Sequence, residues 1–419
     1  MTVMVKTTVF ITSIIISIIV AGVAGYYIGL SSGGMPLTQT IATQTIYHTT
    51  TETYTHALIT TYTYTLTTKP TPETLTTPSR EEMLKPIIEA AKKEGKLVIY
   101  SVLDRPSAEP LLNAFKAKYP FIDIEYVELG GPSVYKRYLQ EKAAGAPTAD
   151  ILLSTSADLQ YMLILQGSAL PYRLTTYDNL PERVKYREMA YIPYYVLIAP
   201  IYNTQKIPKE LAPKSYADVL KLLTTRTDLF PPKSIAVFDI EKNALALVFT
   251  YYLYKGDPVL TESLFKATGK IGYLLYSASG PQIEVVGKGE AVLALTLVSN
   301  YAYIQSKTNP NIGVFVPNDI AVLQPAIVFI TKEAQHPNAA KLMLEFIMSE
   351  EGQNFLAKGD LVPSVVDNPY TPQYSLSYLM NYIKKPIIVR LGDGIIDELL
   401  KDDVRKSFIQ MWKNWLGAG

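Results

Sequence analysis

The chain has 419 residues, of which 48% are hydrophobic and 18% are charged. Its 39 Lys and Arg side chains nearly balance its 38 Asp and Glu side chains, so it lacks the basic surface by which proteins bind nucleic acid. It contains no cysteine, which excludes disulfide bonds, thiolate metal sites and a lipid anchor attached to cysteine.

Residues 7–30 are an uncharged, mostly apolar stretch close to the amino terminus. A helix of this length, at about 1.5 Å per residue, can cross a hydrocarbon core of about 30 Å. Lys6 precedes the stretch and favours a start inside the cell. We predict a transmembrane anchor within residues 1–34, and a signal peptide cleaved near the small residues 22–24 is the alternative. Both interpretations export the rest of the chain.

A threonine-rich segment follows the apolar stretch. Between residues 38 and 77, 19 of the 40 residues are threonine, with tyrosines interleaved and prolines near the end. Such a segment has too few aliphatic residues to bury a core, so we predict a disordered linker over residues 35–80. Its composition is typical of an O-glycosylated stalk, with a bare tether as the alternative. Residues 61–65 could instead form a strand by propensity.

The region after the linker begins with alternating strands and helices. A helix ends at Gly95, and a strand at residues 96–101 leads through a short loop to a helix capped by Ser107. Two further units repeat this order, with strands at 121–128 and 149–153 and helices at 134–144 and 157–165. The alternation predicts a mostly parallel sheet covered by helices. Ligands bind such sheets at the carboxyl ends of the strands, where helix amino termini present free amide groups.

Residues 191–204 form a long uncharged stretch with the composition of a buried strand. Pro193 and Pro200 cannot donate to a strand ladder, so we expect a strand that bends or changes its sheet partners, with an edge strand of one large domain as the alternative. The strand and helix pattern then starts again. Its elements are expected at residues 234–240, 243–254, 277–282, 291–298, 312–317, 321–331 and 337–357, and around Phe408, Trp412 and Trp415. Two similar halves joined by two passages predict a two-lobed α/β fold.

Six short sequences occur in an order that points to a family. They lie at residues 96–119, 149–151, 202–204, 213–220, 287–291 and 336–340. In this ordered set the chain resembles the exported solute-binding proteins of ABC importers, in particular the ferric-ion-binding-protein-like group, and its anchor and stalk resemble those of archaeal members. The resemblance implies a type II periplasmic-binding-protein fold with a mostly parallel sheet, flanked by helices, in each lobe. It places lobe 1 at residues 81–192 and 332–419, lobe 2 at residues 204–311, and the two crossings at residues 193–203 and 312–331.

Ferric-binding members of this family hold iron with two adjacent tyrosines, a histidine and a glutamate. At the matching positions this chain has Tyr301 and Tyr303 separated by Ala302, Asp104 in place of the histidine, and no carboxylate at residues 154–156. Fe(III) prefers anionic oxygen ligands, so the missing glutamate leaves the set incomplete. If the ligand is ferric iron, the resemblance implies Asp104, Tyr301 and Tyr303 as its ligands, with an exogenous anion completing the site.

Hydroxyl groups at strand ends favour an oxyanion or a polyhydroxylated solute instead. Helix amino termini and hydroxyls bind phosphate-like groups without a net positive charge. Each of these residues could equally serve only as a helix cap, and three tyrosines could stack on an organic part of the solute. The predicted ligand-binding residues are Ser101, Asp104, Ser154, Thr155, Ser156, Tyr194, Ser277, Ser279, Gln282, Tyr301 and Tyr303.

The predicted function is the extracellular solute-binding component of an ABC transporter, which captures a small polar or anionic solute between two lobes and delivers it to the membrane permease. We expect a monomer on the extracellular face of the cell membrane, with no cofactor and no nucleic-acid partner. A ferric-ion-binding protein is the alternative. An enzyme is disfavoured because the folded region has one histidine, His336, and no cysteine nucleophile. A structural envelope protein, the remaining class, would bind no solute.

Overall fold

The computed structural model describes residues 46–47, 57–58 and 79–417. The chain divides into two compact units, Met1–Thr77 and Pro78–Gly419. In the first unit, the strands β1 (Ile46–Tyr47) and β2 (Ala57–Leu58) pair antiparallel. The predicted membrane anchor and the other linker residues lie outside the described part of the chain. Within that part, no helix is long and apolar enough to span a membrane.

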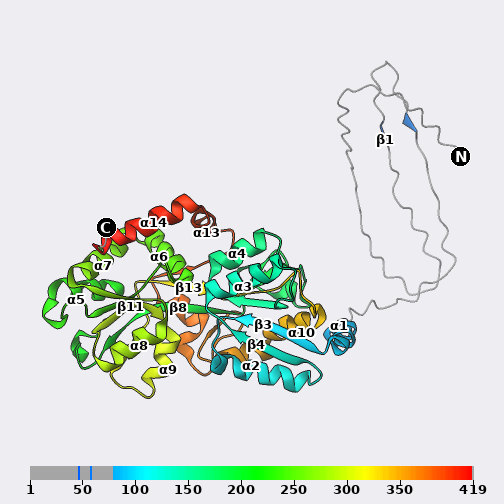
Figure 1. Ribbon diagram of the computed structural model, residues 1–419, viewed down its shortest axis with the longest axis horizontal. Coiled ribbons are helices and arrows are strands. Elements are labelled where there is room, and N and C mark those ends of the chain that lie inside the picture. Colours follow the sequence, from blue (N-terminus) through cyan, green and yellow to red (C-terminus); the bar gives the residue numbers. More distant parts are fainter. Residues whose placement is uncertain (1–45, 48–56, 59–78, 418–419) are drawn as a thin grey trace, which may run out of the picture. The chain divides into compact units, whose positions relative to one another are not determined.

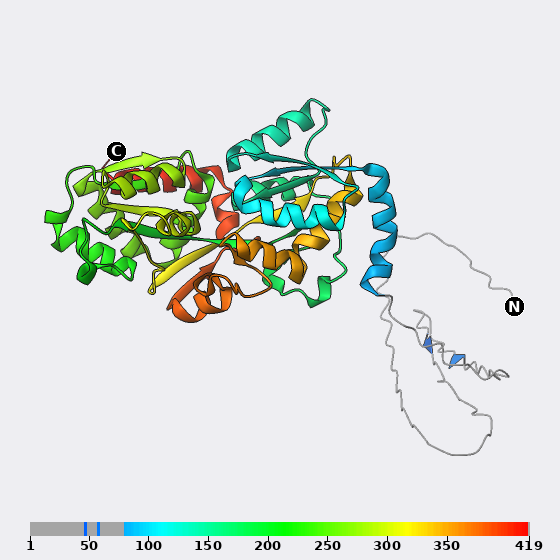
Figure 2. The same ribbon diagram turned by 90° about the horizontal axis from the view of Figure 1, so that it is seen from below.

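The second unit contains two β-sheets that lie side by side with helices packed on them (Figures 1 and 2). The first sheet has the strand order β4-β3-β5-β14-β7-β6. Its strands are β3 (Lys96–Ser101), β4 (Asp123–Glu128), β5 (Ile151–Ser154), β6 (Lys185–Tyr186), β7 (Ala190–Tyr191) and β14 (Ile327–Ile330). The helices around it are α1 (Arg80–Glu94), α2 (Arg105–Lys118), α3 (Gly131–Ala143), α4 (Ala157–Leu165), α10 (Pro337–Ile347) and α11 (Glu350–Lys358).

The second sheet has the order β10-β9-β11-β8-β13-β16, with β12 and β15 also paired to β8. Its strands are β8 (Tyr194–Asn203), β9 (Ile235–Phe238), β10 (Tyr273–Tyr276), β11 (Leu293–Val298), β12 (Ile312–Val314), β13 (Ile320–Pro325), β15 (Val362–Pro363) and β16 (Lys385–Ile388). The remaining α-helices are α5 (Tyr216–Thr225), α6 (Ala244–Gly256), α7 (Pro258–Ile271), α8 (Ser279–Lys288), α9 (Ser299–Ser306), α12 (Leu376–Tyr382), α13 (Ile395–Leu399) and α14 (Asp402–Trp415).

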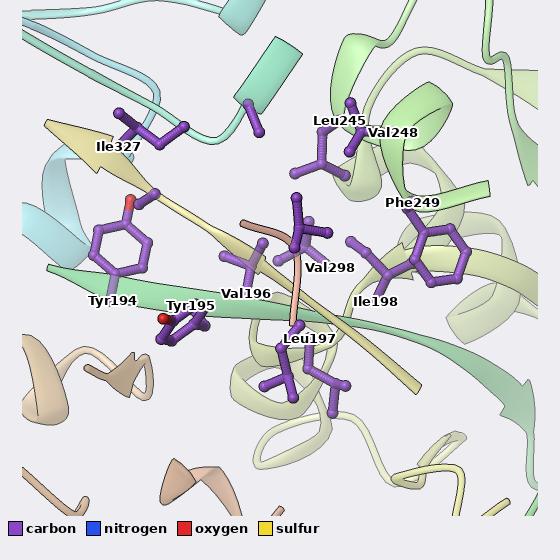
Figure 3. Close-up of a cluster of buried hydrophobic side chains, with 14 of the residues drawn as sticks. Tyr194, Tyr195, Val196, Leu197, Ile198, Leu245, Val248, Phe249, Val298 and Ile327 are labelled. Carbon is purple, nitrogen blue, oxygen red and sulfur yellow. The ribbon is translucent and has the colours of Figure 1, made fainter. Parts of the chain in front are cut away.

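The long strand β8 is the centre of the second sheet, because four other strands pair with it. As expected for Pro193, the chain changes sheets here: β7 pairs in the first sheet, and the chain enters the second sheet after Ile192 and Pro193, whereas Pro200 lies inside β8. Figure 3 shows the side chains from Tyr194 to Ile198 in one buried cluster with Leu245 and Phe249 of α6. Burial of each large apolar side chain contributes about 1.5–3 kcal/mol, which fixes this crossing strand in place.

Both sheets are mixed: the strands of the local units run parallel, as expected, and strands at the crossings run against them. β3 pairs parallel to β4 and β5, whereas β14 runs antiparallel to both β5 and β7. In the second sheet, β8 is antiparallel to all four of its neighbours. The physical reason is the crossing of the chain between the sheets, because a strand that returns from the other sheet enters in the opposite direction to the strands of the local units.

Two helix boundaries also differ from expectation. The helix predicted at 337–357 is two helices, since the side chain of Ser349 caps α11 by accepting a hydrogen bond from the Gly352 N–H at 3.2 Å. A Cβ atom at Gly352 would lie 2.0 Å from the carbonyl oxygen of Phe346, so this close approach requires glycine. Ser107 was the predicted cap of α2, but Asp104 caps the helix instead. The Ser107 N–H donates a hydrogen bond to the Asp104 carboxylate.

The carboxyl-terminal segment packs with the second sheet, although the predicted lobe boundary placed residues 332–419 with the first. β16 pairs parallel to β13. The aromatic rings of α14 lie against α6 and α7, with Phe408 4.9 Å from Tyr251 and Trp415 6.3 Å from Phe265 between ring centroids. From this range α10 and α11 pack with the first sheet, and the Arg405 guanidinium of α14 pairs with Asp158 of α4.

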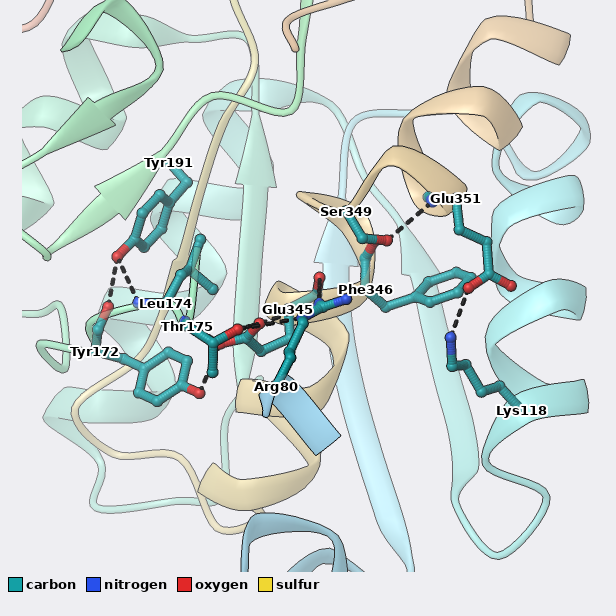
Figure 4. A network of polar contacts seen from close by, with 11 residues as sticks. Arg80, Lys118, Tyr172, Leu174, Thr175, Tyr191, Glu345, Phe346, Ser349 and Glu351 are labelled. Carbon is teal, nitrogen blue, oxygen red and sulfur yellow. Dashed lines mark hydrogen bonds and ion pairs between the residues drawn. The ribbon is translucent and has the colours of Figure 1, made fainter. Parts of the chain in front are cut away.

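A buried carboxylate joins α10 to the start of the folded unit (Figure 4). The Glu345 side chain is 1% exposed and accepts hydrogen bonds from the Arg80 guanidinium at 3.1 Å and from the Tyr172 hydroxyl at 3.0 Å. The N–H and the hydroxyl of Thr175 both donate to it at 2.6 Å. A buried carboxylate is tolerated only when it is paired in this way, so Glu345 fixes α1 to the first half of the unit.

Candidate functional site

A cavity of about 390 Å³, which we call the inner cavity, lies between the two sheets and takes its lining from both. The loop after β3 and the starts of α3 and α4 line it from the first sheet. The loops after β9 and β10 and the start of α9 line it from the second, and Tyr194 and Val196 of β8 complete it. Its volume lies in the range of small-molecule sites, about 300–1,000 Å³.

Four helices begin at the inner cavity without a side-chain cap, namely α3, α4, α8 and α9. Residues at their starts, Gly131, Ser156, Ser279 and Asn300, belong to the lining. The first N–H groups of a helix have no partner within it, and the aligned peptide dipoles place about half a positive charge there. The cavity therefore presents backbone donors from both halves of the unit to an anion.

The starts of α3 and α4 approach each other closely. A Cβ atom at Gly131 would lie 1.9 Å from the hydroxyl oxygen of Ser156, so a larger residue at this position requires Ser156 to move. The Ser154 hydroxyl holds the same turn by accepting a hydrogen bond from the Ser156 N–H at 3.1 Å. Gly131, which follows β4, thus allows the amino termini of α3 and α4 to lie close together.

Asn300 adds a buried polar group that lacks a partner, and Tyr194 adds a buried phenol. Asn300 is 4% exposed, and its amide nitrogen makes no hydrogen bond within the described residues. Tyr194 is 1% exposed; burial raises the pKa of its phenol well above the ordinary value, and the neighbouring Tyr301, Tyr126 and Asp104 raise it further. A buried polar group without a partner costs about 1–3 kcal/mol, which a bound solute can recover.

The charge of the inner cavity is slightly positive. Lys242 is the one charged side chain among its described lining residues. Its ammonium group is 3.0 Å from the Asp239 carboxylate, and the side chain is 73% exposed, so its charge is partly neutralised and screened. No carboxylate reaches the described lining, which favours an anion over a cation as the occupant of this cavity.

A second, larger cavity of about 1050 Å³, the outer cavity, adjoins the inner one. Both cavities are lined by Val102, Ala278, Ser279 and Tyr301. The outer cavity differs in charge, because four carboxylates and two lysines belong to its lining. They are Asp104, Glu128, Glu284, Asp360, Lys288 and Lys358.

Tyr301 lies where the two cavities meet. Burial raises the pKa of its phenol above the ordinary value, and the Asp104 carboxylate raises it further. The phenol therefore stays protonated at neutral pH and offers a hydrogen-bond donor rather than an anionic oxygen. Asp104 caps α2 with one carboxylate oxygen, 3.2 Å from the Ser107 N–H, and the Tyr301 phenol is a neighbouring donor to this carboxylate.

Most of the predicted ligand-binding residues lie at these cavities. The inner cavity is lined by Thr155, Ser156, Tyr194, Ser277, Ser279 and Tyr301, and the outer cavity by Asp104, Ser279 and Tyr301. Ser101 and Ser154 lie behind the lining, where their hydroxyls accept hydrogen bonds from backbone N–H groups. Ser101 and Ser154 therefore stabilise the turns after β3 and β5 without lining either cavity.

Two predicted residues lie elsewhere. Gln282 is fully buried in α8, and its side chain makes one long hydrogen bond, 3.5 Å, to the carbonyl oxygen of Ala278. Tyr303 lines neither cavity and packs edge-on against Tyr374, with 5.5 Å between ring centroids. The Lys307 ammonium group lies 4.7 Å from the same ring. Tyr303 therefore does not share the cavity lining of Asp104 and Tyr301, the other two residues implied for iron.

Several lining residues were not singled out from the sequence. They are Gly130, Gly131, Pro132, Ser133, Lys242, Asn243, Asn300 and Leu361. The Gly-Gly-Pro-Ser turn lies between a predicted strand and a predicted helix, as the serines after β5 do. The sequence alone could therefore have indicated it as part of the site. Asn300 follows the end of β11, but its burial depends on packing that the local sequence does not encode. No group of three or more His, Cys, Asp and Glu side chains in the described residues could hold a metal ion.

Residues 146–384, more than half of the chain, match the family model described as "Bacterial extracellular solute-binding protein". Among solved structures, the substrate-binding protein of an ABC transporter from Agrobacterium tumefaciens is similar, with 26% identity and a TM-score of 0.70. That similarity covers 77% of this chain and 94% of the other.

Two further solved structures share the fold at lower identity. Iron-bound HitA from Pseudomonas aeruginosa has a TM-score of 0.60 at 15% identity, covering 76% of this chain and 99% of its own. AfuA from Actinobacillus pleuropneumoniae, a periplasmic binding protein with bound fructose 6-phosphate, has a TM-score of 0.57 at 18% identity, covering 78% of this chain and 99% of its own. At these identities the similarity establishes the fold and not the ligand.

Proposed function

Because this chain belongs to the family of bacterial extracellular solute-binding proteins, we propose that it captures a solute with a phosphate-like group and binds that group in the inner cavity. The protein is the solute-binding component of an ABC transporter and works with permease subunits. Members of this family are binding proteins rather than enzymes. The observation that carries the proposal is the convergence of four uncapped helix amino termini on a cavity whose described lining contains no carboxylate.

The geometry suits a tetrahedral oxyanion in particular. Such a group has several oxygens that accept hydrogen bonds in different directions, and the four helix starts approach from both halves of the unit. Ser156 and Asn300 supply side-chain donors beside the amides. An anion held by N–H groups needs no counter-charge in the cavity, which agrees with Lys242 as the single charged residue of the described lining.

Ferric iron is the second candidate, favoured by the cluster of Tyr194, Tyr301 and Asp104. Two features weaken it. Tyr303 lies away from the cluster, against Tyr374. In addition, the raised pKa values of Tyr194 and Tyr301 mean that protons compete with iron for both phenolate oxygens at neutral pH. Iron binding here would strengthen as the pH rises, because each phenol must lose its proton.

Location is part of the same proposal. We infer that residues 7–30 hold the protein on the extracellular face of the cell membrane and that the threonine-rich segment separates the anchor from the binding unit. Cleavage of the apolar segment would release the protein instead. Sizing of the mature chain by mass spectrometry distinguishes the two, because a cleaved protein lacks the residues before the cleavage site.

Titration calorimetry with fructose 6-phosphate, inorganic phosphate and ferric citrate tests the proposal. We expect saturable binding of a phosphate-bearing probe and a higher melting temperature. A probe present at 100 times its dissociation constant adds about 2.7 kcal/mol to the free energy of unfolding. The proposal fails if no phosphate-bearing probe binds while ferric citrate produces the visible absorption of an iron–phenolate complex.

A further inference from the structure

The charges that line the outer cavity are not all balanced. Glu284 pairs with Lys288, and Asp360 pairs with Lys307 at 2.8 Å. Lys358 lies over aromatic rings, 4.7 Å from the centroid of Phe355. Asp104 and Glu128 remain, and neither forms an ion pair with a described residue.

Both carboxylates accept hydrogen bonds from backbone N–H groups at the start of α2. Asp104 begins α2, and the Glu128 carboxylate accepts a hydrogen bond from the N–H of the next residue, Arg105, at 2.9 Å. The Arg105 guanidinium is turned to the Tyr126 ring, with 5.8 Å between its carbon and the ring centroid. The two negative charges therefore lie close together, and the neutral phenol of Tyr301 is a neighbouring donor to the Asp104 carboxylate. Two fixed carboxylates beside a neutral donor keep their charge, which suits a cationic donor.

Aromatic side chains surround this position. Tyr301 lines both cavities, and its phenol is close enough to Asp104 and Tyr126 for their charges to affect it. The Tyr194 hydroxyl, from a side chain that is 1% exposed, belongs to the same group of neighbours. Aromatic faces attract ammonium groups, and tyrosine hydroxyls accept hydrogen bonds from them. A solute that extends from the inner to the outer cavity must pass Tyr301, next to both carboxylates.

We propose that the solute is zwitterionic: its anionic group binds at the helix amino termini of the inner cavity, and an ammonium group on the same molecule binds Asp104 and Glu128 in the outer cavity. This inference rests on the proposed function, because the inner cavity must hold the anionic end. It adds that the outer cavity selects for an amine over a hydroxyl group. A phosphorylated amino sugar or a phosphorylated amino alcohol has this chemistry.

Two matched pairs of probes test the amine preference with the full-length protein. Glucosamine 6-phosphate and glucose 6-phosphate differ by an ammonium group in place of a hydroxyl, and phosphoethanolamine and ethyl phosphate differ by the presence of the ammonium group. Calorimetry should give at least one pair in which the amine binds tenfold or more tightly. Equal affinities within both pairs would overturn the inference and leave the phosphate assignment intact. Failure of all four probes to bind would overturn the phosphate assignment as well.

Variants locate the preference. Asp104→Asn combined with Glu128→Gln removes both charges, and asparagine can still cap α2, so the helix should persist. We expect the ratio of the two dissociation constants in the selective pair to fall to about one. Asp123→Asn is the matched control, because it removes a carboxylate from the opposite end of the same strand, β4, where the side chain is 82% exposed. If the ratio of dissociation constants stays at tenfold in the double variant, these carboxylates do not select for the amine.

Discussion

Asn300 is the residue whose environment is best explained by a bound anion. Its amide nitrogen is buried at the start of α9, where the helix amino terminus already favours negative charge. Without a ligand the nitrogen has no acceptor in the described part of the chain, which is a cost to the empty protein. A phosphate oxygen would supply that acceptor.

Asn300→Asp should therefore weaken binding of a phosphate-bearing solute by at least about 100-fold, since it replaces a donor by a carboxylate that repels the anion. Loss of a charge-assisted hydrogen bond and added repulsion each cost about 1.5–3 kcal/mol. Calorimetry with fructose 6-phosphate measures the change. Asn309→Asp is the control and should have a smaller effect, because Asn309 lines the outer cavity and not the inner one. Equal losses in the two variants would mean that Asn300 does not face the anion.

The predicted site residues show which part of a binding site local sequence can reveal. Thr155 and Ser156 line the inner cavity, where a buried strand followed by a helix led us to expect them. Tyr303 lines neither cavity, because its ring packs against Tyr374, which is distant in the sequence. Asn300 was passed over, since only the tertiary packing buries it. Positions at element boundaries are thus predictable, and the direction of a side chain within a helix is not.

Among the elements, α1 depends on one buried contact for its attachment. Arg80, in its first turn, donates to the carboxylate of Glu345 at 3.1 Å and to its backbone oxygen at 3.0 Å. We expect Arg80→Ala to lower the free energy of unfolding by about 1–3 kcal/mol, because it leaves a buried carboxylate with fewer donors. Chemical denaturation measures this change. Lys85→Ala, an exposed position on the same helix, should stay within about 0.5 kcal/mol. A similar loss in both variants would contradict the assigned role of Glu345.

Elements with strong local signals were predicted closely, and those defined by long-range pairing were not. The strand at residues 96–101 matches its prediction, because Gly95 ends the preceding helix in the left-handed conformation at φ 64°. Ser79 and Glu82 form a capping box at the start of the same helix, which is likewise a local signal. β16 was missed because it is a strand only through its pairing with β13. The antiparallel direction of β14 likewise depends on the route of the whole chain, which no short window of sequence contains.

At the scale of the molecule, three crossings connect the halves. The chain passes between the sheets near Pro193, again near Ala326, and a third time between α11 and β15. Buried glutamines hold the first two places: the Gln353 amide donates to the Pro193 carbonyl oxygen at 2.9 Å, and the Gln160 amide donates to that of Ile327 at 3.2 Å. These connections restrict relative motion of the halves to a hinge.

We predict that solute closes the two halves about these crossings, because the inner cavity takes its lining from both. A preference of about 1.4 kcal/mol for the closed form shifts the equilibrium tenfold. Small-angle scattering with saturating solute should show a smaller radius of gyration than without it. The control is the Asn300→Asp variant at the same solute concentration, which should remain open. An unchanged radius in a protein that is open when empty would exclude hinge closure.

The proposed use of backbone amides for the anion has a consequence for how this protein can evolve. An N–H group persists through every substitution except proline, so random mutation rarely removes the four donors at the inner cavity. The carboxylates of the outer cavity have no such protection, since a single base change can replace Asp104 or Glu128. After gene duplication, the two proteins would therefore diverge first in their preference for the part of the solute that lies in the outer cavity. Both would continue to bind its anionic end.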